Sequence, residues 1–91
     1  MKTHCLKIHK SMVDALDGGL KKAEFRHNDR DFKVHDQLEL RGVDDNGDPC
    51  CDGWRGRYIV THVVYGPSFE IPDGYCMMSI AKPLHWIENT D

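Results

Sequence analysis

Hydrophobic and polar residues alternate along most of this chain, and a period of two is typical of strands with one buried face. In the first such segment, Leu6 and Ile8 alternate with small or polar side chains. A later segment is rich in β-branched and aromatic residues and ends at Gly66-Pro67, which makes it the strongest strand signal. The segments predicted as strands are residues 3 to 9, 22 to 26, 37 to 41, 57 to 65 and about 75 to 81.

The second of these segments carries charged residues at alternate positions. Lys22, Glu24 and Arg26 fall at period two, and Ala23 and Phe25 occupy the positions between them. Because successive side chains of a strand point to opposite faces, we expect Ala23 and Phe25 on a buried face. The opposite face then presents a carboxylate between two cations, and it is the first candidate for a binding site.

One short helix is predicted between the first two strands. Ser11, with Asp14 three residues later, is a near-match to a capping box, and Gly18-Gly19 supplies the stop because glycine adopts the left-handed conformation without penalty. A helix of this length is stable only when it packs against a sheet. The apolar residues at helical spacing are Met12, Val13, Leu16 and Leu20.

The connections after the second and third predicted strands have the composition of turns. Asn28-Asp29 begins the first turn, since both side chains can bond nearby backbone groups. Phe32 and Val34 are expected to fill the core beneath it. The stretch from 44 to 49 is an acidic turn sequence.

These elements fit a single domain. Ninety-one residues leave no room for a second domain, and at this size about 60 to 65% of the unfolded surface can be buried. We predict an α+β fold dominated by β-structure over residues 1 to 91, a small, partly open barrel of about five or six strands with one or two short helices. Pro83 ends the last strand, and the tail from 83 to 91, which contains Trp86, either packs back on the barrel or frays.

The charge of the chain is unevenly distributed. Twelve basic and 15 acidic residues give a formal net charge of -3, which argues against a protein that coats nucleic acid by bulk attraction. Residues 21 to 33 nevertheless hold five basic and three acidic side chains, a local charge of +2 that leaves -5 for the rest of the chain. Much of that negative charge lies in the loop from Asp44 to Asp52. Any anion site must therefore be local.

Composition argues against several other classes. No apolar segment near Met1 resembles a secretion signal, and the longest apolar stretch is too short to cross a bilayer, so we expect a cytoplasmic protein without a membrane partner. The four cysteines are then free thiols, with Cys5 and Cys76 as small strand hydrophobes. Cys50 and Cys51 are adjacent and the histidines lack paired spacing, so no metal or other cofactor is expected.

The residues after the predicted helix form a motif. Gly19, Lys21, Glu24 and Arg26 follow the pattern G-x-K-x-x-E-x-R. This pattern resembles the signature of the ASCH superfamily, a group of small PUA-like β-barrels. The flanks are similar to a branch of unknown function found in bacteria and phages, through His4, Leu6, Lys7 and Ile8 before the motif and Asn28 to Phe32, Val34, Asp36 and Leu38 after it. That branch usually has a Gly-Asp turn where this chain has His35-Asp36, and glycine there would suit a positive φ.

The resemblance implies a cleft beside the connection between helix and strand, with a role in binding RNA, a nucleotide or a modified nucleoside. Arg26 and Arg30 offer planar donors for a phosphate or a base edge, and Lys21 offers a point charge. Asn28 can donate and accept at once. The candidate ligand-binding residues are Lys21, Glu24, Arg26, Asn28 and Arg30.

Three alternatives stay open, although we expect a binding module rather than an enzyme. Some ASCH relatives are hydrolases that deacetylate an acetylated cytidine or cleave RNA without metal, which makes Lys21 and Glu24 the candidate catalytic residues. Glu24 stands where the deacetylase has a threonine. A carboxylate beside a lysine favours the charged form of the lysine, which opposes its use as a base. In a second alternative, the acidic loop 44 to 52 binds a protein partner, as an interaction or inhibitor module carried by a phage. In the third, Glu24 and Arg26 are an ion pair without a ligand.

Aromatic side chains add a further way to bind RNA, because unpaired bases stack on them. The candidates are Trp54, Tyr58, Tyr65 and Trp86. Most of these are expected in the core or at its edge. Trp54 differs, since it lies in a loop beside Arg55 and Arg57.

Overall fold

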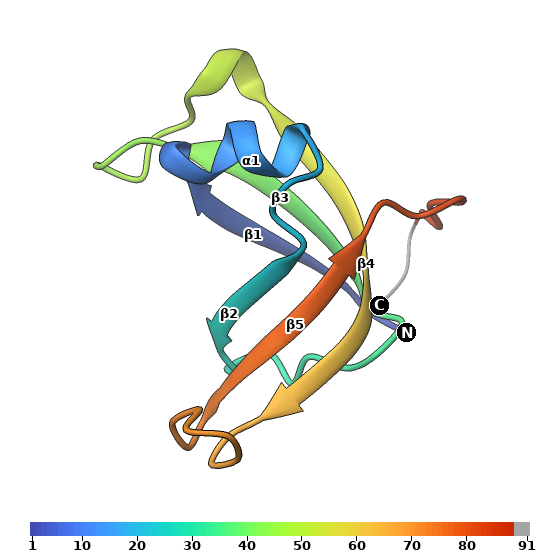
Figure 1. Cartoon of the computed structure of the whole chain (residues 1–91). Helices are drawn as coiled ribbons and strands as arrows, with labels where there is room; N and C mark the ends of the chain where they lie inside the picture. The colour runs from blue at the N-terminus through green and yellow to red at the C-terminus, as the bar shows by residue number, and fades with distance from the viewer. Residues whose placement is uncertain (89–91) are drawn as a thin grey trace.

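In the computed structural model, which describes residues 1 to 88, the chain forms one five-stranded sheet curled into a half barrel, with a short helix at one end (Figure 1). The strand order is β1-β3-β4-β5-β2. The prediction of a small, mainly β fold is thereby confirmed, and five strands lie within the five or six expected. The elements are β1 (Thr3–His9), α1 (Val13–Asp17), β2 (Ala23–His27), β3 (Gln37–Val43), β4 (Arg55–Tyr65) and β5 (Tyr75–Ala81), with 3₁₀ turns at Lys10–Met12 and Cys51–Gly53.

The two edge strands of the sheet, β1 and β2, are joined by side chains. β1 runs parallel to β3, and the other neighbouring strands are antiparallel. Arg26 Nη2 donates to the carbonyl oxygen of Lys7 at 2.5 Å, and Arg30 Nη1 donates to that of Cys5 at 3.1 Å. Cys5 and Lys7 are alternate residues, so both carbonyls point to the same side of β1. We call this junction of β1 and β2 the seam.

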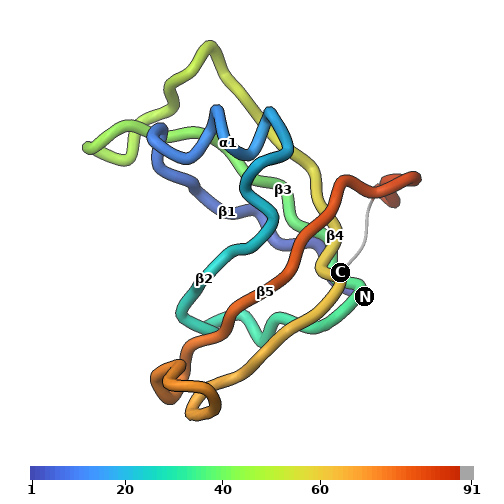
Figure 2. Tube along the Cα trace, in the orientation of Figure 1, coloured from blue at the N-terminus to red at the C-terminus, as the bar shows by residue number. Residues whose placement is uncertain are grey.

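The connection from β2 to β3 crosses the lower part of the half barrel, as the Cα trace shows (Figure 2). Asn28 Oδ1 accepts a hydrogen bond from the backbone N–H of Phe32 at 2.8 Å, which confirms the turn predicted at Asn28. Phe32 is fully buried, as predicted. Val34 is not, because residues 33 to 36 form a surface turn in which its side chain stays exposed.

The core fills the inside of the curled sheet. Cys76 belongs to it, as predicted, whereas Cys5 is exposed, because it alternates with Leu6, whose side chain takes the inner face. The buried apolar side chains form one cluster of Leu6, Ile8, Val13, Leu16, Phe32, Leu38, Leu40, Tyr58, Val60, Cys76, Met78 and Ile80. The sheet and the helix therefore share a single core.

Helix α1 contributes two of these side chains, Val13 and Leu16, while Met12 and Leu20 are exposed. Five residues make too short a helix for all four apolar positions to face the sheet. The capping box predicted from Ser11 does not form. Instead, the chain enters a 3₁₀ turn at Lys10–Met12, and the His9 ring accepts from the Ser11 N–H at 3.2 Å. No helix within residues 1 to 88 is long and apolar enough to span a bilayer.

Two buried polar side chains attach the ends of the chain to the sheet. The Asp36 carboxylate accepts from the His4 ring at 2.9 Å and from the backbone N–H groups of Lys2 and Lys33, both at 3.1 Å. Burial raises the pKa of Asp36, but these hydrogen bonds outweigh it and hold the pKa below its ordinary value. The Gln37 amide bonds both backbone groups of Ile87 at 2.8 Å.

The sequence leaves open whether the tail from 83 to 91 packs back on the barrel or frays. The contacts of its residues up to 88 favour packing. The Arg57 guanidinium lies 5.0 Å from the centre of the Trp86 ring, a cation–π distance. The bonds between Gln37 and Ile87 continue this attachment. The last part of the predicted tail, residues 89 to 91, lies outside the described residues.

Candidate functional site

Strand β2 presents its faces the opposite way from the sequence prediction. Glu24 is only 4% exposed, whereas Phe25 is 47% exposed and Ala23 is also on the outer face. The register explains this, because Glu24 lies opposite the buried Met78 and Phe25 lies opposite Met77, whose side chain points outward. A period of two fixes that the faces differ but leaves open which one is inside.

Glu24 can be buried because two cations contact it. Lys21 Nζ lies 3.1 Å from Oε1, and Arg26 Nε donates to Oε2 at 2.8 Å. Lys21 also donates to the carbonyl oxygen of Ala23. Both carboxylate oxygens are therefore satisfied, and the lysine, glutamate and arginine of the motif are in direct contact. We call these three residues the Glu24 triad.

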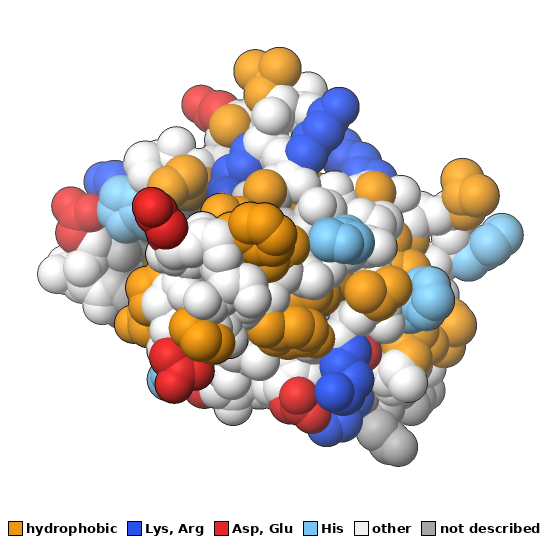
Figure 3. All heavy atoms as spheres, turned by 60° about the horizontal axis from the view of Figure 1, so that its bottom comes forward, with side chains coloured by type: hydrophobic (Ala, Val, Ile, Leu, Met, Phe, Trp, Pro, Cys, Tyr) orange, Lys and Arg blue, Asp and Glu red, His pale blue; other side chains and the backbone are white. Residues whose placement is uncertain are grey.

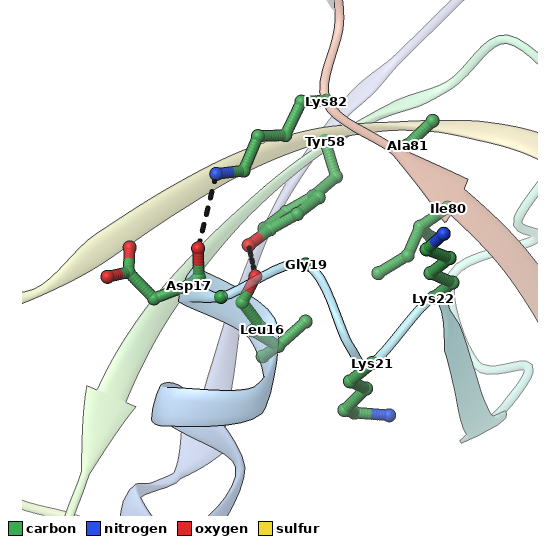
Figure 4. Close-up of a pocket in the computed structure, with 10 residues that line it drawn as sticks. Leu16, Asp17, Gly19, Lys21, Lys22, Tyr58, Ile80, Ala81 and Lys82 are labelled. Carbon is green, nitrogen blue, oxygen red and sulfur yellow. Dashed lines mark hydrogen bonds between the residues drawn. The ribbon is translucent and has the colours of Figure 1, made fainter.

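A pocket of about 350 Å³ lies beside α1, and we call it the helix pocket (Figure 4). The Lys21 ammonium points away from Tyr58 and Lys82, because it is held by Glu24. The Tyr58 hydroxyl donates to the carbonyl oxygen of Leu16 at 3.2 Å, and burial raises its pKa. The pocket is lined by Leu16, Asp17, Gly18, Gly19, Lys21, Lys22, Tyr58, Ile80, Ala81 and Lys82.

A second pocket, of about 330 Å³, lies at the seam, and we call it the seam pocket. Its basic side chains are Lys7, Arg26, Arg30 and Arg41, joined by His27, and Asp29 is its one carboxylate. The remaining lining comes from Cys5, Leu6 and Phe32. In a chain with a net charge of -3, this is a pronounced local reversal of charge.

The basic side chains of the seam pocket continue as a row on the outer face of the sheet. Lys7 of β1 is the register partner of Arg41 of β3, and Arg41 is in turn the partner of Arg55 of β4. All three side chains are exposed. Glu39 Oε1 accepts from Arg55 at 2.8 Å, so the acid neutralises that end of the row. We call Lys7, Arg41 and Arg55 the cationic row.

The predicted site residues are therefore divided between two pockets. Lys21 borders the helix pocket, Arg26 and Arg30 border the seam pocket, and Glu24 joins the two through its ion pairs. Asn28 serves the turn, since its Oδ1 bonds the Phe32 N–H. The predicted residues thus border two pockets, with the Glu24 triad between them.

Sequence reasoning missed Lys7 and Arg41 as site residues. Lys7 alternates with buried residues of β1, and Arg41 does so in β3, so each was a plain exposed strand position. Only the parallel pairing of β1 with β3 brings them together. Parallel strands are joined by a long crossover, and the register across it has no local sequence signal.

Trp54 and the acidic loop 44 to 52, which were also candidates from the sequence, make contacts within the protein. Trp54 is half-buried against the core, and its indole N–H donates to Asp17 at 3.2 Å. In the acidic loop, the Asp44 carboxylate accepts from the backbone N–H groups of Asn46 and Asp48, and Asp45 lies 2.5 Å from His9. Within residues 1 to 88, no group of three or more His, Cys, Asp or Glu side chains is arranged to hold a metal ion.

Residues 3 to 80 match the model of a family described as Domain of unknown function (DUF3850). Among curated proteins, none matches the chain. The matched range begins with β1 and reaches into β5, so it contains all residues of the Glu24 triad and of the seam pocket.

Proposed function

The chain belongs to the family of the domain of unknown function DUF3850, and we propose that it binds single-stranded RNA or a nucleotide through the phosphates. The observation that carries this proposal is the gathering of Lys7, Arg26, Arg30 and Arg41 around one pocket that contains a single carboxylate. Phosphate contacts from arginine and lysine supply most of the sequence-independent affinity for nucleic acids.

The cationic row supports the proposal of an anionic ligand, because like charges on neighbouring strands repel each other. Cations directly opposite one another in a sheet destabilise it. Within residues 1 to 88, no ion pair involves Lys7 or Arg41. A bound phosphate placed between them would relieve this repulsion. The protein thus keeps an arrangement that is unfavourable on its own and favourable with an anion.

The extent of the row favours a chain of phosphates. Lys7, Arg41 and Arg55 belong to three successive strands of the sheet. Neighbouring strands are about 4.8 Å apart, so the row spans roughly 10 Å. A chain of phosphates can contact the seam pocket and Arg55 at once, whereas a single phosphate placed between Lys7 and Arg41 cannot.

The Glu24 triad supports binding more than hydrolysis. Lys21 Nζ contacts Glu24 Oε1 and donates to the carbonyl oxygen of Ala23. A lysine that acts as base or nucleophile needs its nitrogen free to reach the substrate, and here both contacts would have to be broken first. In our proposal, Glu24 instead orients Arg26, whose remaining donors face the seam pocket.

The triad also supports a proposed kinship with ASCH domains. The lysine, glutamate and arginine of the G-x-K-x-x-E-x-R pattern meet in space, and the half barrel is compatible with a small PUA-like barrel. We propose that the chain is a divergent member of that superfamily. An experimental structure that superposes β1 to β5 on a known ASCH barrel in the same order tests this kinship.

The binding proposal is tested with two double variants that change the net charge equally. Lys7→Gln/Arg41→Gln removes two cations from the seam pocket, and Lys22→Gln/Lys82→Gln removes two from the helix pocket. Affinity for a fluorescent single-stranded RNA is measured by anisotropy at several salt concentrations. Each phosphate contact contributes about 0.7 to the slope of log K against log salt, so the seam variant should lose about 1.4.

The seam variant should also bind about tenfold more weakly, and the helix-pocket variant should match the wild type. Equal losses in both variants would show that only bulk charge matters. Absence of RNA and nucleotide binding by the wild-type protein at low salt would refute the proposed function. Parallel titrations with single-stranded DNA and with nucleoside monophosphates identify which ligand class is preferred.

A further inference from the structure

An aromatic surface lies on the outer face of β2 and β5. The rings of Phe25 and Tyr75 are stacked, with centroids 5.5 Å apart and planes inclined by 11°. The His27 ring lies 5.1 Å from that of Tyr75. Figure 3 shows the molecule from the side of its lower end, where hydrophobic side chains gather in the middle of the face. We call Phe25, His27 and Tyr75 the aromatic platform.

The platform is solvent-exposed although an apolar side chain gains by burial. Phe25 is 47% exposed, Tyr75 is 38% exposed, and Met77 beside them is 37% exposed. On the same strand, Glu24 occupies the inner face. Proteins usually bury apolar side chains and expose charged ones. Strand β2 has the reverse arrangement, since it buries Glu24 and exposes Phe25. Exposed apolar patches of this kind mark interaction sites.

The platform is continuous with the seam pocket through His27. The His27 ring contacts Tyr75 and also lines the seam pocket together with Arg26 and Arg30. A basic groove beside exposed aromatic rings is the arrangement by which proteins bind single-stranded nucleic acids, since cations hold the backbone and rings stack the bases. On the premise of the proposed function, we infer that the aromatic platform stacks unpaired bases of the RNA whose phosphates occupy the seam pocket.

Neighbouring charges favour this occupant over a protein partner. Arg26 and Arg30 share the seam pocket with His27 of the platform, and they match a ligand that carries phosphates and flat rings within one nucleotide. Stacking requires a π-face, whereas a protein that covers an apolar patch requires only apolar area. This difference can be measured.

The inference is tested with Phe25→Leu/Tyr75→Leu, which keeps apolar side chains and removes both stacked rings. The matched control is Phe69→Leu, because Phe69 is 87% exposed and lies outside the platform. Anisotropy with a labelled single-stranded RNA should show an affinity loss of about fivefold or more for the double variant, since one stacked base contributes at least about that factor. The salt slope should stay as in the wild type, because no phosphate contact is lost.

A second measurement uses the unmodified protein and is independent of the folding of any variant. Wild-type protein should bind an abasic oligonucleotide of equal length as weakly as the double variant binds RNA. Ultraviolet cross-linking to RNA followed by mass spectrometry should place the cross-link at Phe25 or Tyr75.

The outcomes separate this inference from the proposed function. In one outcome, the seam variant loses affinity, Phe25→Leu/Tyr75→Leu binds RNA like the wild type, and the abasic oligonucleotide binds like the intact RNA. That outcome refutes the role of the platform and leaves phosphate binding standing. Platform substitutions that disrupt self-association or a protein complex without changing RNA affinity would also refute it. If wild-type protein binds no RNA, the proposed function fails and the platform fails with it.

Discussion

Replacement of Arg26 by leucine should destabilise the fold because it leaves the Glu24 carboxylate buried with only one cation. Glu24 has a side chain only 5% exposed, and Arg26 Nε is its closest donor at 2.8 Å. Removal of one partner of a fully buried ion pair costs about 3 to 5 kcal/mol. Arg26 is 24% exposed and Lys21 stays in place, so we expect about 2 kcal/mol from this source.

The same substitution also removes the hydrogen bond from Arg26 to the carbonyl oxygen of Lys7 across the seam. Such a bond contributes about 1 kcal/mol, which brings the expected loss in unfolding free energy to about 3 kcal/mol. For a domain of this size, that loss lowers the melting temperature by about 12 to 24 °C. Urea unfolding followed by the fluorescence of Trp54 and Trp86 measures it, provided that the m-value is unchanged.

Two further variants separate the ion pair from the seam. Arg30→Leu loses only a seam bond, to Cys5, and should cost about 1 kcal/mol. In the double variant Glu24→Gln/Arg26→Leu, the buried carboxylate that Arg26 would neutralise is gone, so its loss should be smaller than the sum of the single losses by about 1 to 2 kcal/mol. Additive losses, or an Arg26→Leu variant as stable as Arg30→Leu, would refute the view that Arg26 neutralises Glu24.

Two other predictions concern Asp36 and His35, in the surface turn of residues 33 to 36. Since the pKa of Asp36 is held below its ordinary value of 3.8, its contribution to stability is complete above that pH and is lost as the pH falls through the lowered pKa. Asp36→Asn should therefore be less stable at neutral pH and show a flatter acid-unfolding curve than the wild type, measured by circular dichroism between pH 6 and about 2. His35 has a φ of 78°, where L side chains are strained, so His35→Gly should stabilise the fold by about 0.5 to 1 kcal/mol in urea unfolding. A glycine variant less stable than the wild type would show that the His35 side chain makes a stabilising contact of its own.

The strands of this protein could be predicted because their information is local. Leu6 and Ile8 reveal β1 by their spacing, and residues 57 to 65 reveal β4 by their composition. The positive φ expected from comparison of His35-Asp36 with a glycine turn is confirmed at His35. Each of these features depends on a few neighbouring residues, so no knowledge of the fold was needed.

The orientation of β2 could not be predicted, because the local pattern favours the orientation that is not observed. Phe25 favours the inside by its apolar area and a charged Glu24 favours the outside, so both preferences predict the same, wrong orientation. The contacts of Glu24 with Lys21 and Arg26 reverse that preference, since a carboxylate with both oxygens paired is far less costly to bury. Neither the burial of Glu24 nor the exposure of the aromatic platform follows from the period of two.

By itself, the sequence determined the class of the fold, the strands and the motif Gly19 to Arg26. Only the tertiary structure decided where the cations of the site lie, because Lys7 and Arg41 are far apart in the chain and meet through the parallel register of β1 and β3. The seam has the same origin, since Arg26 reaches the carbonyl of Lys7 only after the sheet has curled. Hydrophobic spacing shows that a strand has two different faces, whereas a binding site depends on which strands become neighbours.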